Sequence, residues 1–546
     1  MKNPDLLQKL RGIDIGASAG ADGSAGMLLA EWLASGVRFA SSSPEMEAQY
    51  YRALRELFSC IRPLTDNEPI LNEGGVYLGC WLESTGTINA ELLSRFLPSV
   101  AARTFSGFAR YQRADGLLPY KITSAGPAFN QIQIVTPLAR SVWNHYLLNG
   151  RDRGFLGTMY AAMARYDEWI ATWRDTRKTG GVEAFGCYDT GHDLSPRFWH
   201  MPDSPLGNDA RAYDPNNPLL PLVAPDLTAN IACQRRYLAR IAEELGEDSE
   251  TWRSKAGRSE SALFDCCYDD EDAFFYDLDN NQQFVRVQSD VLLRVLACEI
   301  GDGAAFEIAL QRYLLNTRKF FARYPLTSIA LDDPRYDPEY SYNSWAGPTN
   351  FLSLIRAPHA FEHHHRHVEL SWVLNPALHA LFRAERFAQT IHPFTGREGF
   401  TETYSPAILC LLDFIERLSG ILPRPDGSLW FTGLVPRPID HRDQSFETGY
   451  GRSVDGAAFE LVNAAGECTA FHDGELLFQC PMGLRVVTGR DGSLRSLIGM
   501  SVQTIEGTLA FAGRNHPFRI AANQQLDLVD GELVSVRNPG LVPPST

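Results

Sequence analysis

A recurring helical pattern of apolar residues constrains the fold of this chain more than any other feature of its sequence. From about Pro44 to Gly420, apolar residues recur with the period of an amphipathic helix. Long polar stretches rich in Gly, Pro, Asn and aromatic residues interrupt this pattern, which predicts helical hairpins that carry functional loops. We expect helices at about 46–60, 90–111, 137–148, 157–173, 226–246, 289–300, 304–321, 349–357, 368–387 and 404–418. No exact sequence repeat accompanies them, so the pattern favours a toroid of paired helices over a simple repeat solenoid.

The segment 226–246 shows the helical pattern most clearly. Its apolar residues share one helical face, which predicts that this face is buried. Asp226 is placed to cap the start of the helix and Gly246 to end it, because these residue types favour the two helix termini.

After Pro423 the pattern changes to short β-prone runs separated by Gly-containing turns. Asp473-Gly474, Asp491-Gly492 and Asp530-Gly531 predict hairpins, because Asp and Gly tolerate the positive φ angles that tight turns require. The last residues, NPGLVPPST, are expected to form a loose tail. The expected division of the chain is an N-terminal segment (1–43), a helical domain (44–422) and a small antiparallel β domain with the tail (423–546).

Composition limits the classes of ligand that suit this chain. The formal net charge of -16 argues against binding to nucleic acid or to an anionic membrane surface, since both attract basic proteins. The first residues lack the apolar core of a signal peptide, and no stretch has the apolar length of a membrane span, so we expect a cytoplasmic protein. The cysteines form no CxxC pair and are expected to be reduced and buried. A neutral or polar small molecule fits best, and the oligomeric state is left open.

One loop, Gly186 to Asp203, concentrates chemistry in a segment that has neither helical nor strand periodicity. It contains three carboxylates, two histidines, an arginine and three aromatic residues. Aromatic neighbours raise the pKa of a carboxyl by excluding water, which suits a proton donor, whereas Arg197 opposes this effect by stabilising the anion. Residue chemistry alone does not rank Asp189 against Asp193. The structural alternative is that Asp193 caps a turn and Arg197 holds it by an ion pair.

The order Asp189-Thr-Gly-His-Asp193-Leu-Ser-Pro-Arg197 resembles the "E-S/T-G-x-D-x-S-P-R" loop of the helix-toroid glycosidases. These include trehalase, the processing α-glucosidases and the mannosylglycerate and glucosylglycerate hydrolases. The segment around Trp345, Gly347 and Pro348 is similar to their "W-R-G-P" motif, and the resemblance spans about 72–420. It implies an (α/α)6 toroid, a carbohydrate substrate and Asp193 as general acid. Asp189 stands where the relatives commonly have Glu.

The chain departs from the family pattern at the second catalytic carboxylate. The relatives supply a base in a segment of the form "E-x-Y-x-P-x-T-G", and here Gln389 occupies that position and cannot remove a proton from water. We favour Glu402 as the base, with Glu398 behind it, although both are equally well explained as solvated loop acids. Ala346 also replaces the arginine that often follows the tryptophan, so the substrate of the relatives does not carry over.

Several further residues are candidates for binding a sugar. Trp345 is either a stacking platform or a plug of the core. The substrate-binding candidates are Trp81, Tyr111, Gln133, Asp189, His192, Arg197, Trp345 and Gln389.

The histidine-rich segment from Phe361 to Glu369 raises the question of a metal. Only His363 and His367 have the spacing that shares a helical face, so we expect no metal site and assign His364 or His365 to the pocket as hydrogen-bond donors. No Gly-rich loop with a phosphate-binding pattern is present, and no cofactor is expected.

The sequence therefore predicts an inverting hydrolase of an α-linked disaccharide or small glycoside. Asp193 is expected to protonate the leaving oxygen and Glu402 to activate water. Glycosyl transfer or phosphorolysis on the same scaffold is one alternative, because it explains the missing base. A non-catalytic sugar-binding protein is the other.

Overall fold

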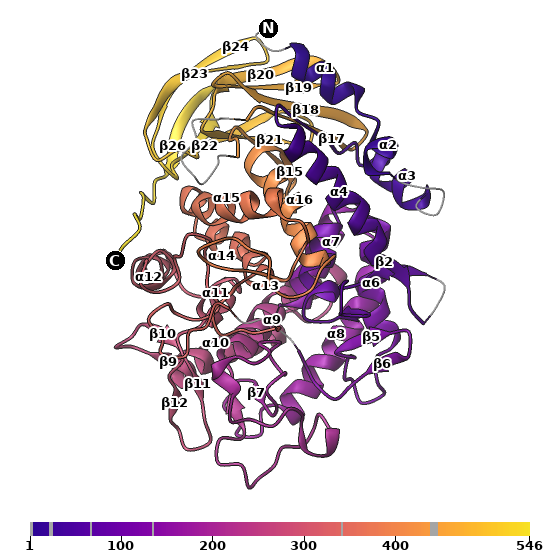
Figure 1. Cartoon of the computed structure of the whole chain (residues 1–546), viewed down its shortest axis with the longest axis vertical. Helices are drawn as coiled ribbons and strands as arrows, with labels where there is room; N and C mark the ends of the chain where they lie inside the picture. Colours follow the sequence, from indigo (N-terminus) through magenta and orange to yellow (C-terminus); the bar gives the residue numbers. More distant parts are fainter. Residues whose placement is uncertain (1–3, 21–25, 66–67, 134–135, 340–341, 437–445) are drawn as a thin grey trace.

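Helices account for more residues than strands, and antiparallel sheets lie at one end of the molecule (Figure 1). The computed structural model describes residues 4–20, 26–65, 68–133, 136–339, 342–436 and 446–546. Its α-helices are α1 (Pro4–Gly12), α2 (Ile15–Ala19), α3 (Gly26–Ala34), α4 (Pro44–Cys60), α5 (Ala90–Leu93), α6 (Pro98–Arg110), α7 (Leu138–Leu148), α8 (Arg153–Trp173), α9 (Pro225–Leu245), α10 (Glu250–Cys267), α11 (Val291–Leu296), α12 (Gly303–Ala309), α13 (Phe351–Leu354), α14 (Ala357–His363), α15 (His367–Arg383) and α16 (Ser405–Ser419).

The strands before the C-terminal region are short, and most of those within it are longer. The short strands are β1 (Arg38–Ser41), β2 (Ile61–Pro63), β3 (Pro69–Leu71), β4 (Cys80–Trp81), β5 (Lys121–Thr123), β6 (Gly126–Ala128), β7 (Glu183–Ala184), β8 (Leu222–Val223), β9 (Tyr268–Asp269), β10 (Phe274–Phe275), β11 (Asp277–Leu278), β12 (Phe284–Val285), β13 (Thr349–Asn350) and β14 (Thr390–Ile391). The C-terminal strands are β15 (Ile421–Pro423), β16 (Ser428–Thr432), β17 (Thr448–Val454), β18 (Ala457–Ala464), β19 (Glu467–His472), β20 (Glu475–Pro481), β21 (Leu484–Gly489), β22 (Leu494–Gly499), β23 (Ile505–Phe511), β24 (Arg514–Ile520), β25 (Gln525–Val529) and β26 (Glu532–Arg537).

The helices pack mainly against neighbours in the sequence. α9 packs on α10, α7 on α8, and α15 on α16. The last helix of the series, α16, also packs against α4, the first one, so the two ends of the helical region meet.

Several predicted helices are shorter in the structure than their apolar pattern, among them those expected at 289–300 (α11) and 349–357 (α13). The helix expected at 90–111 is two helices, α5 and α6, because Pro98 lacks an N–H and Leu97 before it adopts φ -135° and ψ 69°. The helix expected at 304–321 ends as α12 at Ala309 and continues as a π-helix over Leu310–Leu314.

The predicted helix at 226–246 corresponds to α9, with a correction at its start. Gly246 ends it in the left-handed conformation, φ 83°, as predicted. Asp226 lies inside the first turn instead of capping it, because the helix begins at Pro225 and the Asp226 carboxylate binds Arg197.

Two antiparallel sheets form the C-terminal region, as the sequence predicts. One has seven strands in the order β1-β17-β18-β19-β20-β23-β24, and the other has six in the order β15-β16-β21-β22-β25-β26. Asp473-Gly474 and Asp530-Gly531 have positive φ at both residues and join adjacent strands. The sequence did not predict that β1, from the N-terminal segment, pairs with β17.

The C-terminal residues are fixed, contrary to the expected loose tail. Ser545 exchanges backbone hydrogen bonds with the segment after α12, accepting from Thr317 at 2.9 Å and donating to Leu315 at 3.0 Å. Val542 is buried, and its N–H donates to Glu369 Oε1 at 2.9 Å. These bonds tie the end of the chain to the helices.

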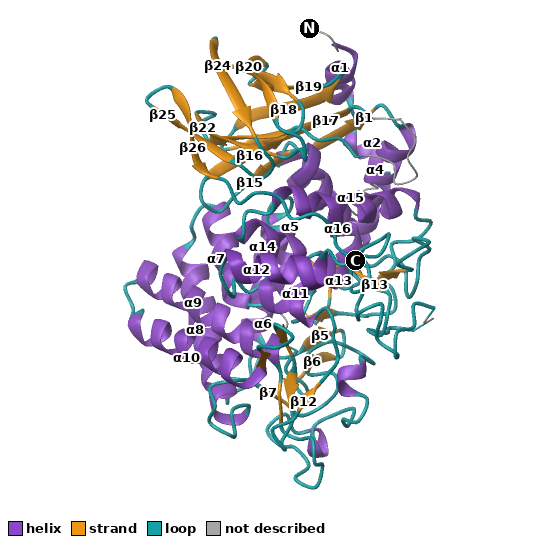
Figure 2. Cartoon of the chain, turned by 90° about the vertical axis from the view of Figure 1, so that its left-hand side faces the viewer, coloured by secondary structure: helices purple, strands orange, loops and turns teal. Residues whose placement is uncertain are grey.

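One hydrophobic core runs from the helices into the sheets. It includes Leu54 of α4, Leu411 of α16, Phe431 of β16 and Phe478 of β20. Long loops with the short strands β5, β6, β7 and β12 lie away from the C-terminal sheets (Figure 2). Among the described residues, no helix is long and apolar enough to cross a bilayer. The cysteines are all free thiols, and only Cys266 is partly exposed.

Candidate active site

The loop that follows β7 brings Asp193 into a buried polar cluster. Gly191 and Leu194 adopt positive φ, 74° and 58°, which turns the chain sharply on either side of Asp193. Ser195 then caps a short 3-10 turn, with its hydroxyl accepting from the Arg197 N–H at 3.4 Å. Asp193 is thereby presented between two turns.

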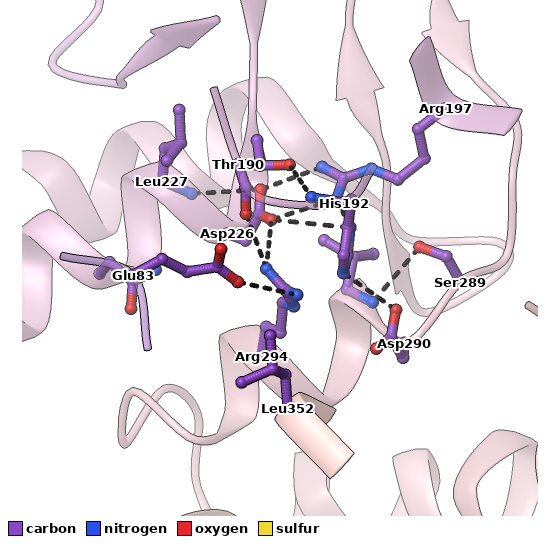
Figure 3. Close-up of polar contacts among 12 residues, drawn as sticks. Glu83, Thr190, His192, Arg197, Asp226, Leu227, Ser289, Asp290, Arg294 and Leu352 are labelled. Atoms are coloured by element: carbon purple, nitrogen blue, oxygen red, sulfur yellow. Dashed lines mark hydrogen bonds and ion pairs between the residues drawn. The ribbon is translucent and has the colours of Figure 1, made fainter. Parts of the chain in front are cut away.

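Arg197 fixes the end of this loop through ion pairs with two carboxylates. Its guanidinium donates to Asp226 at 3.0 and 3.1 Å and to Asp277 at 2.7 Å through two nitrogens, and all three side chains are buried. Arg197 holds the pKa of Asp226 down to about 2 although burial opposes this. Arg197 was predicted to bind substrate, but its nitrogens are already used within the protein, which gives it a positioning role (Figure 3).

His192 links Arg197 to Asp290, the residue that precedes α11. An arginine nitrogen only donates, so the 2.6 Å contact from Arg197 to His192 Nδ1 leaves the ring proton on Nε2, which lies 3.1 Å from Asp290 Oδ1. Burial, together with the charge of Arg294, lowers the pKa of His192 to about 4. His192 is fully buried, so it supports the loop from behind and does not face a substrate.

Asp189 is also internal, and its carboxylate is bound within the protein. Its carboxylate accepts from Arg174 at 2.5 Å, from the N–H of Phe185 at 2.6 Å and from the N–H of Gly186 at 3.2 Å. Asp189 is 0% exposed. Its predicted role in substrate binding is therefore corrected to one of holding the loop.

Asp193 differs from these residues because it is only half-buried and its carboxyl is not neutralised by a direct ion pair among the described residues. Asn343 donates to Oδ2 at 2.5 Å, and the backbone N–H of Trp345 donates to the Asp193 carbonyl at 3.2 Å. Burial raises the pKa of Asp193 to about 7, against the opposing effects of Arg294 and Asn343, and Glu73 adds to the rise. A carboxyl with this pKa can donate a proton near neutral pH.

Two further buried carboxyls, Glu73 and Glu83, interact electrostatically with Asp193. The sequence analysis missed both, although Glu83 stands two residues after Trp81 in a segment that it flagged. Glu73 accepts hydroxyl hydrogen bonds from Ser84 at 2.5 Å, Thr85 at 3.0 Å and Tyr404 at 2.7 Å, which occupy both of its oxygens. The Glu73 carboxylate is therefore held in place by hydrogen bonds within the protein.

Glu83 has a free acceptor. Within the described part of the chain, its Oε1 has no hydrogen-bond partner, and Arg294 and Arg356 each lie 3.8 Å from it. Burial raises the pKa of Glu83 to about 8, while the two arginines oppose that rise. Figure 3 shows Glu83 and Arg294 facing one another next to Asp226. A Cβ on Gly191 would lie 2.2 Å from Glu83 Oε2, so this carboxylate packs directly against the loop 186–203 that carries Asp193, called the acid loop below.

The two bases predicted from the sequence lie elsewhere. Glu402 is exposed between Thr401 and Thr403, both at positive φ, and its charge acts on Glu56 of α4. Glu398 accepts from the backbone N–H of Glu385 at 2.6 Å. Among the described contacts, neither carboxylate meets Asp193.

Gln389 is buried at the position of the expected base. Its Oε1 accepts from the Tyr77 hydroxyl at 2.9 Å. The Tyr77 ring in turn makes an edge contact with Trp81, with the ring centroids 5.6 Å apart. Tyr77 thus contacts both Gln389 and Trp81.

The remaining residues predicted to bind substrate lie either next to the loop that carries Asp193 or away from it. Trp345 is only 1% exposed and lies between Arg294 and His192, each 4.6 Å from its ring, so the structure gives it the role of a core plug. Gln133 lies beside the acid loop, 3.4 Å from the Tyr188 carbonyl. Tyr111 bonds through its hydroxyl to Thr65, outside this cluster.

The histidine-rich segment lies apart from this cluster. The His364 ring stacks on Phe306 at 4.3 Å, and His365 Nδ1 accepts from Arg537 at 3.1 Å. The prediction that either histidine lines the substrate pocket is therefore corrected. In the described ranges, no group of three or more His, Cys, Asp or Glu side chains is arranged to hold a metal ion.

Comparison with known proteins identifies the family of this chain. The profile of the family described as mannosylglycerate hydrolase MGH1-like glycoside hydrolase domain matches residues 80–406. No curated protein matches the sequence.

Similar folds occur among solved structures. A GH63 mannosylglycerate hydrolase from Thermus thermophilus, in complex with Tris, aligns with TM-score 0.58 and 19% identity, covering 66% of this chain and 99% of that one. A sialidase aligns with TM-score 0.59 and 14% identity, covering 86% of this chain and 44% of that one. A GH78 rhamnosidase from Bacillus sp. GL1 aligns with TM-score 0.52 and 11% identity, covering 79% and 41%. At these identities the likeness establishes the fold.

Proposed function

We propose that this chain cleaves a small α-linked glycoside with inversion. The chain belongs to the family of mannosylglycerate hydrolase MGH1-like glycoside hydrolase domains and is a glycoside hydrolase. In this proposal Asp193 is the general acid that protonates the leaving oxygen. The observation that carries it is the environment of Asp193, where burial raises the pKa to about 7 while Asn343 positions the carboxyl.

The proposed substrate is a sugar joined to a small polar acceptor. The solved relative is a mannosylglycerate hydrolase, and another of its structures is a complex with glucose. Mannosylglycerate is therefore the first compound to test, followed by α-linked disaccharides. Ala346, where relatives often have arginine, is the reason to include more than one sugar.

We also propose the architecture that the sequence predicts, an (α/α)6 toroid over residues 44–422. The contact between α16 and α4 supports closure of the ring. The sheets at 423–546 then form a second domain, to which the N-terminal segment 1–43 contributes β1.

For the base we propose Glu83 in place of Glu402 and Glu398. Glu83 is buried, interacts with Asp193 and has an oxygen free to accept from a water molecule, whereas Glu73 uses both of its oxygens. Burial raises the pKa of Glu83 to about 8, and Arg294 and Arg356 limit this rise, so only a fraction of Glu83 is ionised near pH 7 and the ionised fraction grows toward pH 8. An inverting enzyme needs acid and base on opposite faces of the sugar, with room for water between them.

The test of the reaction is NMR of the anomeric proton during hydrolysis of mannosylglycerate and of a panel of α-disaccharides. Inversion predicts that the β-anomer of the released sugar forms first and then mutarotates. First-formed α-anomer contradicts inversion. Absence of turnover on every α-glycoside contradicts the proposed substrate class.

Gln389 favours one second candidate, phosphorolysis, because phosphate needs no base to attack. Measuring turnover with and without inorganic phosphate separates the two. Release of free sugar without phosphate supports hydrolysis, and formation of a sugar 1-phosphate that requires phosphate supports the alternative.

A further inference from the structure

The histidine-rich segment and the six-stranded sheet enclose a polar cavity that lies apart from Asp193. It has a volume of about 430 Å³ and lies between the turn that joins α14 to α15 and the strands β16, β21, β22, β25 and β26. Figure 1 shows α15 below the strands β22 and β26, with α14 next to α15. The side chains that decide its chemistry are His365, His367, Arg424, Arg495 and Arg537.

Both histidines present a hydrogen-bond donor. Arg537 lies 3.1 Å from His365 Nδ1, and Arg485 lies 3.1 Å from His367 Nδ1. A guanidinium has no acceptor, so each Nδ1 accepts and each ring is neutral with its proton on Nε2. Burial and the neighbouring arginine lower the pKa of both histidines, to about 4 for His365. The rings therefore stay neutral donors across the physiological pH range.

Two arginines, Arg485 and Arg495, add positive charge that no direct ion pair with a carboxylate offsets in the described structure. Arg485 is 0% exposed and donates only to neutral acceptors, namely Thr432 Oγ1 at 2.9 Å, His367 Nδ1 and the Arg417 carbonyl at 3.0 Å. Arg495, on β22, is exposed at the cavity. In the described structure, neither Arg485 nor Arg495 forms an ion pair with a carboxylate.

The cavity is poorly suited to stacking a sugar. Arg424 and Arg485 each centre 4.2 Å from the centroid of the Trp430 ring. Two guanidinium groups this close to one centroid occupy opposite faces, because on one face they would overlap. The indole thus has no face left for a carbohydrate.

Glu362 is fully paired among the acids of the lining, whereas Asp426 and Asp527 each have one oxygen in a hydrogen bond. Both oxygens of Glu362 bind arginines, Arg417 and Arg424. Asp426 accepts from the Ser428 N–H and hydroxyl, and Asp527 accepts from the Gln525 amide at 2.7 Å. In the described contacts, the N–H groups of Arg495 and the Nε2–H groups of the two histidines outnumber the two carboxylate oxygens that remain, Oδ2 of Asp426 and Oδ2 of Asp527.

We propose that this cavity binds an oxyanion of the phosphate type, held by Arg495, Arg537 and the Nε2–H groups of His365 and His367. Guanidinium groups and neutral imidazole donors match the acceptor oxygens of a phosphate group. The volume leaves room for a small group esterified to that phosphate, so inorganic phosphate and a phosphate monoester share this chemistry. The site is separate from Asp193 and does not depend on the proposed hydrolysis.

The experiment is calorimetric titration of the full chain with inorganic phosphate and with a hexose phosphate, at constant ionic strength, with the unphosphorylated hexose as reference. We expect saturable binding of phosphate compounds and at least about a tenfold weaker affinity in Arg495→Gln and Arg537→Gln, since a charge-assisted hydrogen bond is lost. Tighter binding of the ester identifies a metabolite, and equal affinities identify the free ion.

Two variants serve as controls. Arg519→Gln removes an exposed arginine of the other sheet, paired with Glu506, and should bind phosphate as the unaltered chain does. Asp193→Asn should also leave the affinity unchanged, which excludes binding at the catalytic cluster. No saturable phosphate binding, or equal weakening in Arg519→Gln, overturns the proposal. Circular dichroism checks that each variant is folded.

Discussion

Asp193 keeps its proton near neutral pH because burial outweighs the arginine and amide that stabilise its anion. Asp189, four residues earlier, has the same chemistry but meets Arg174 and two backbone N–H groups, so its carboxylate is committed to the fold. Two aspartates of one loop thus have different environments, and of this pair Asp193 has the raised pKa that the proposed general acid requires.

The pKa of Asp193 predicts the pH dependence of catalysis. A general acid must be protonated and the proposed base Glu83, whose pKa is about 8, must be ionised, so kcat/KM should be highest between about pH 7 and 8 and fall on both sides; the measurement is a pH profile of kcat/KM. The same shift has a sign for stability. The folded-state value lies above the ordinary 3.8, so this group's stabilising contribution is present below about pH 4 and is lost as the pH rises through about 7. An activity limb unchanged in position when Asn343 is replaced by alanine contradicts this assignment, because loss of that donor should raise the pKa further.

The assignment of the base to Glu83 predicts a selective rescue. Glu83→Gln should lower kcat by about 10²–10⁴-fold, and azide, which attacks without deprotonation, should restore turnover as glycosyl azide. The matched variants Glu402→Gln and Glu398→Gln should keep nearly full activity, because their side chains lie away from Asp193. Strong loss in Glu402→Gln with none in Glu83→Gln restores the base favoured by the sequence.

At the scale of elements, the acid loop depends on close packing between Gly191 and Glu83. Gly191 has φ 74°, and a Cβ there would lie 2.2 Å from Glu83 Oε2. The arrangement of two segments far apart in the sequence therefore rests on the absence of one methyl group.

Gly191→Ala should displace Glu83 or the loop and reduce kcat by about 10²-fold, as small misplacements of catalytic groups do. Gly207→Ala is the matched control, since Gly207 has φ 64° and open space around its Cβ position. Steady-state kinetics of both variants is the measurement. Equal activity of the two variants argues against close packing at Gly191.

The elements themselves were predicted where periodicity or turn chemistry decides them. The Asp-Gly hairpins and the helix that ends at Gly246 are local features, and they are present. Pairing of β1 with β17 was not predictable, because a four-residue strand has too little pattern and its partner is distant in the sequence. Glu73 and Glu83 were missed for a similar reason. Their importance comes from burial beside Asp193, which no local motif announces.

At the scale of the whole molecule, a buried ionic network joins the helices to the sheets. Arg95 pairs with Asp413 at 2.5 Å and with Glu416 at 3.1 Å, and Arg452 of β17 pairs with Glu416. The hydrophobic core also continues from the helices into both sheets. We expect the two regions to unfold together.

Arg452→Leu should lower the free energy of unfolding by about 3–5 kcal/mol, because it leaves buried charge without its partner. The control is Arg490→Leu, which removes an ion pair with the mostly exposed Asp455 and should cost less than about 1 kcal/mol. Denaturation followed by far-ultraviolet circular dichroism and by tryptophan fluorescence should give coincident single transitions. Two separate transitions contradict the joint unfolding of helices and sheets.

The most direct test of the central claim, that Asp193 is the general acid, compares two leaving groups in Asp193→Asn. A glycosyl fluoride departs without protonation, whereas the natural type of glycoside needs a proton on its leaving oxygen. The variant should retain hydrolysis of the α-fluoride of the accepted sugar to within about tenfold and lose about 10²–10⁴-fold on the glycoside. An equal loss on both substrates contradicts the role of Asp193 as proton donor.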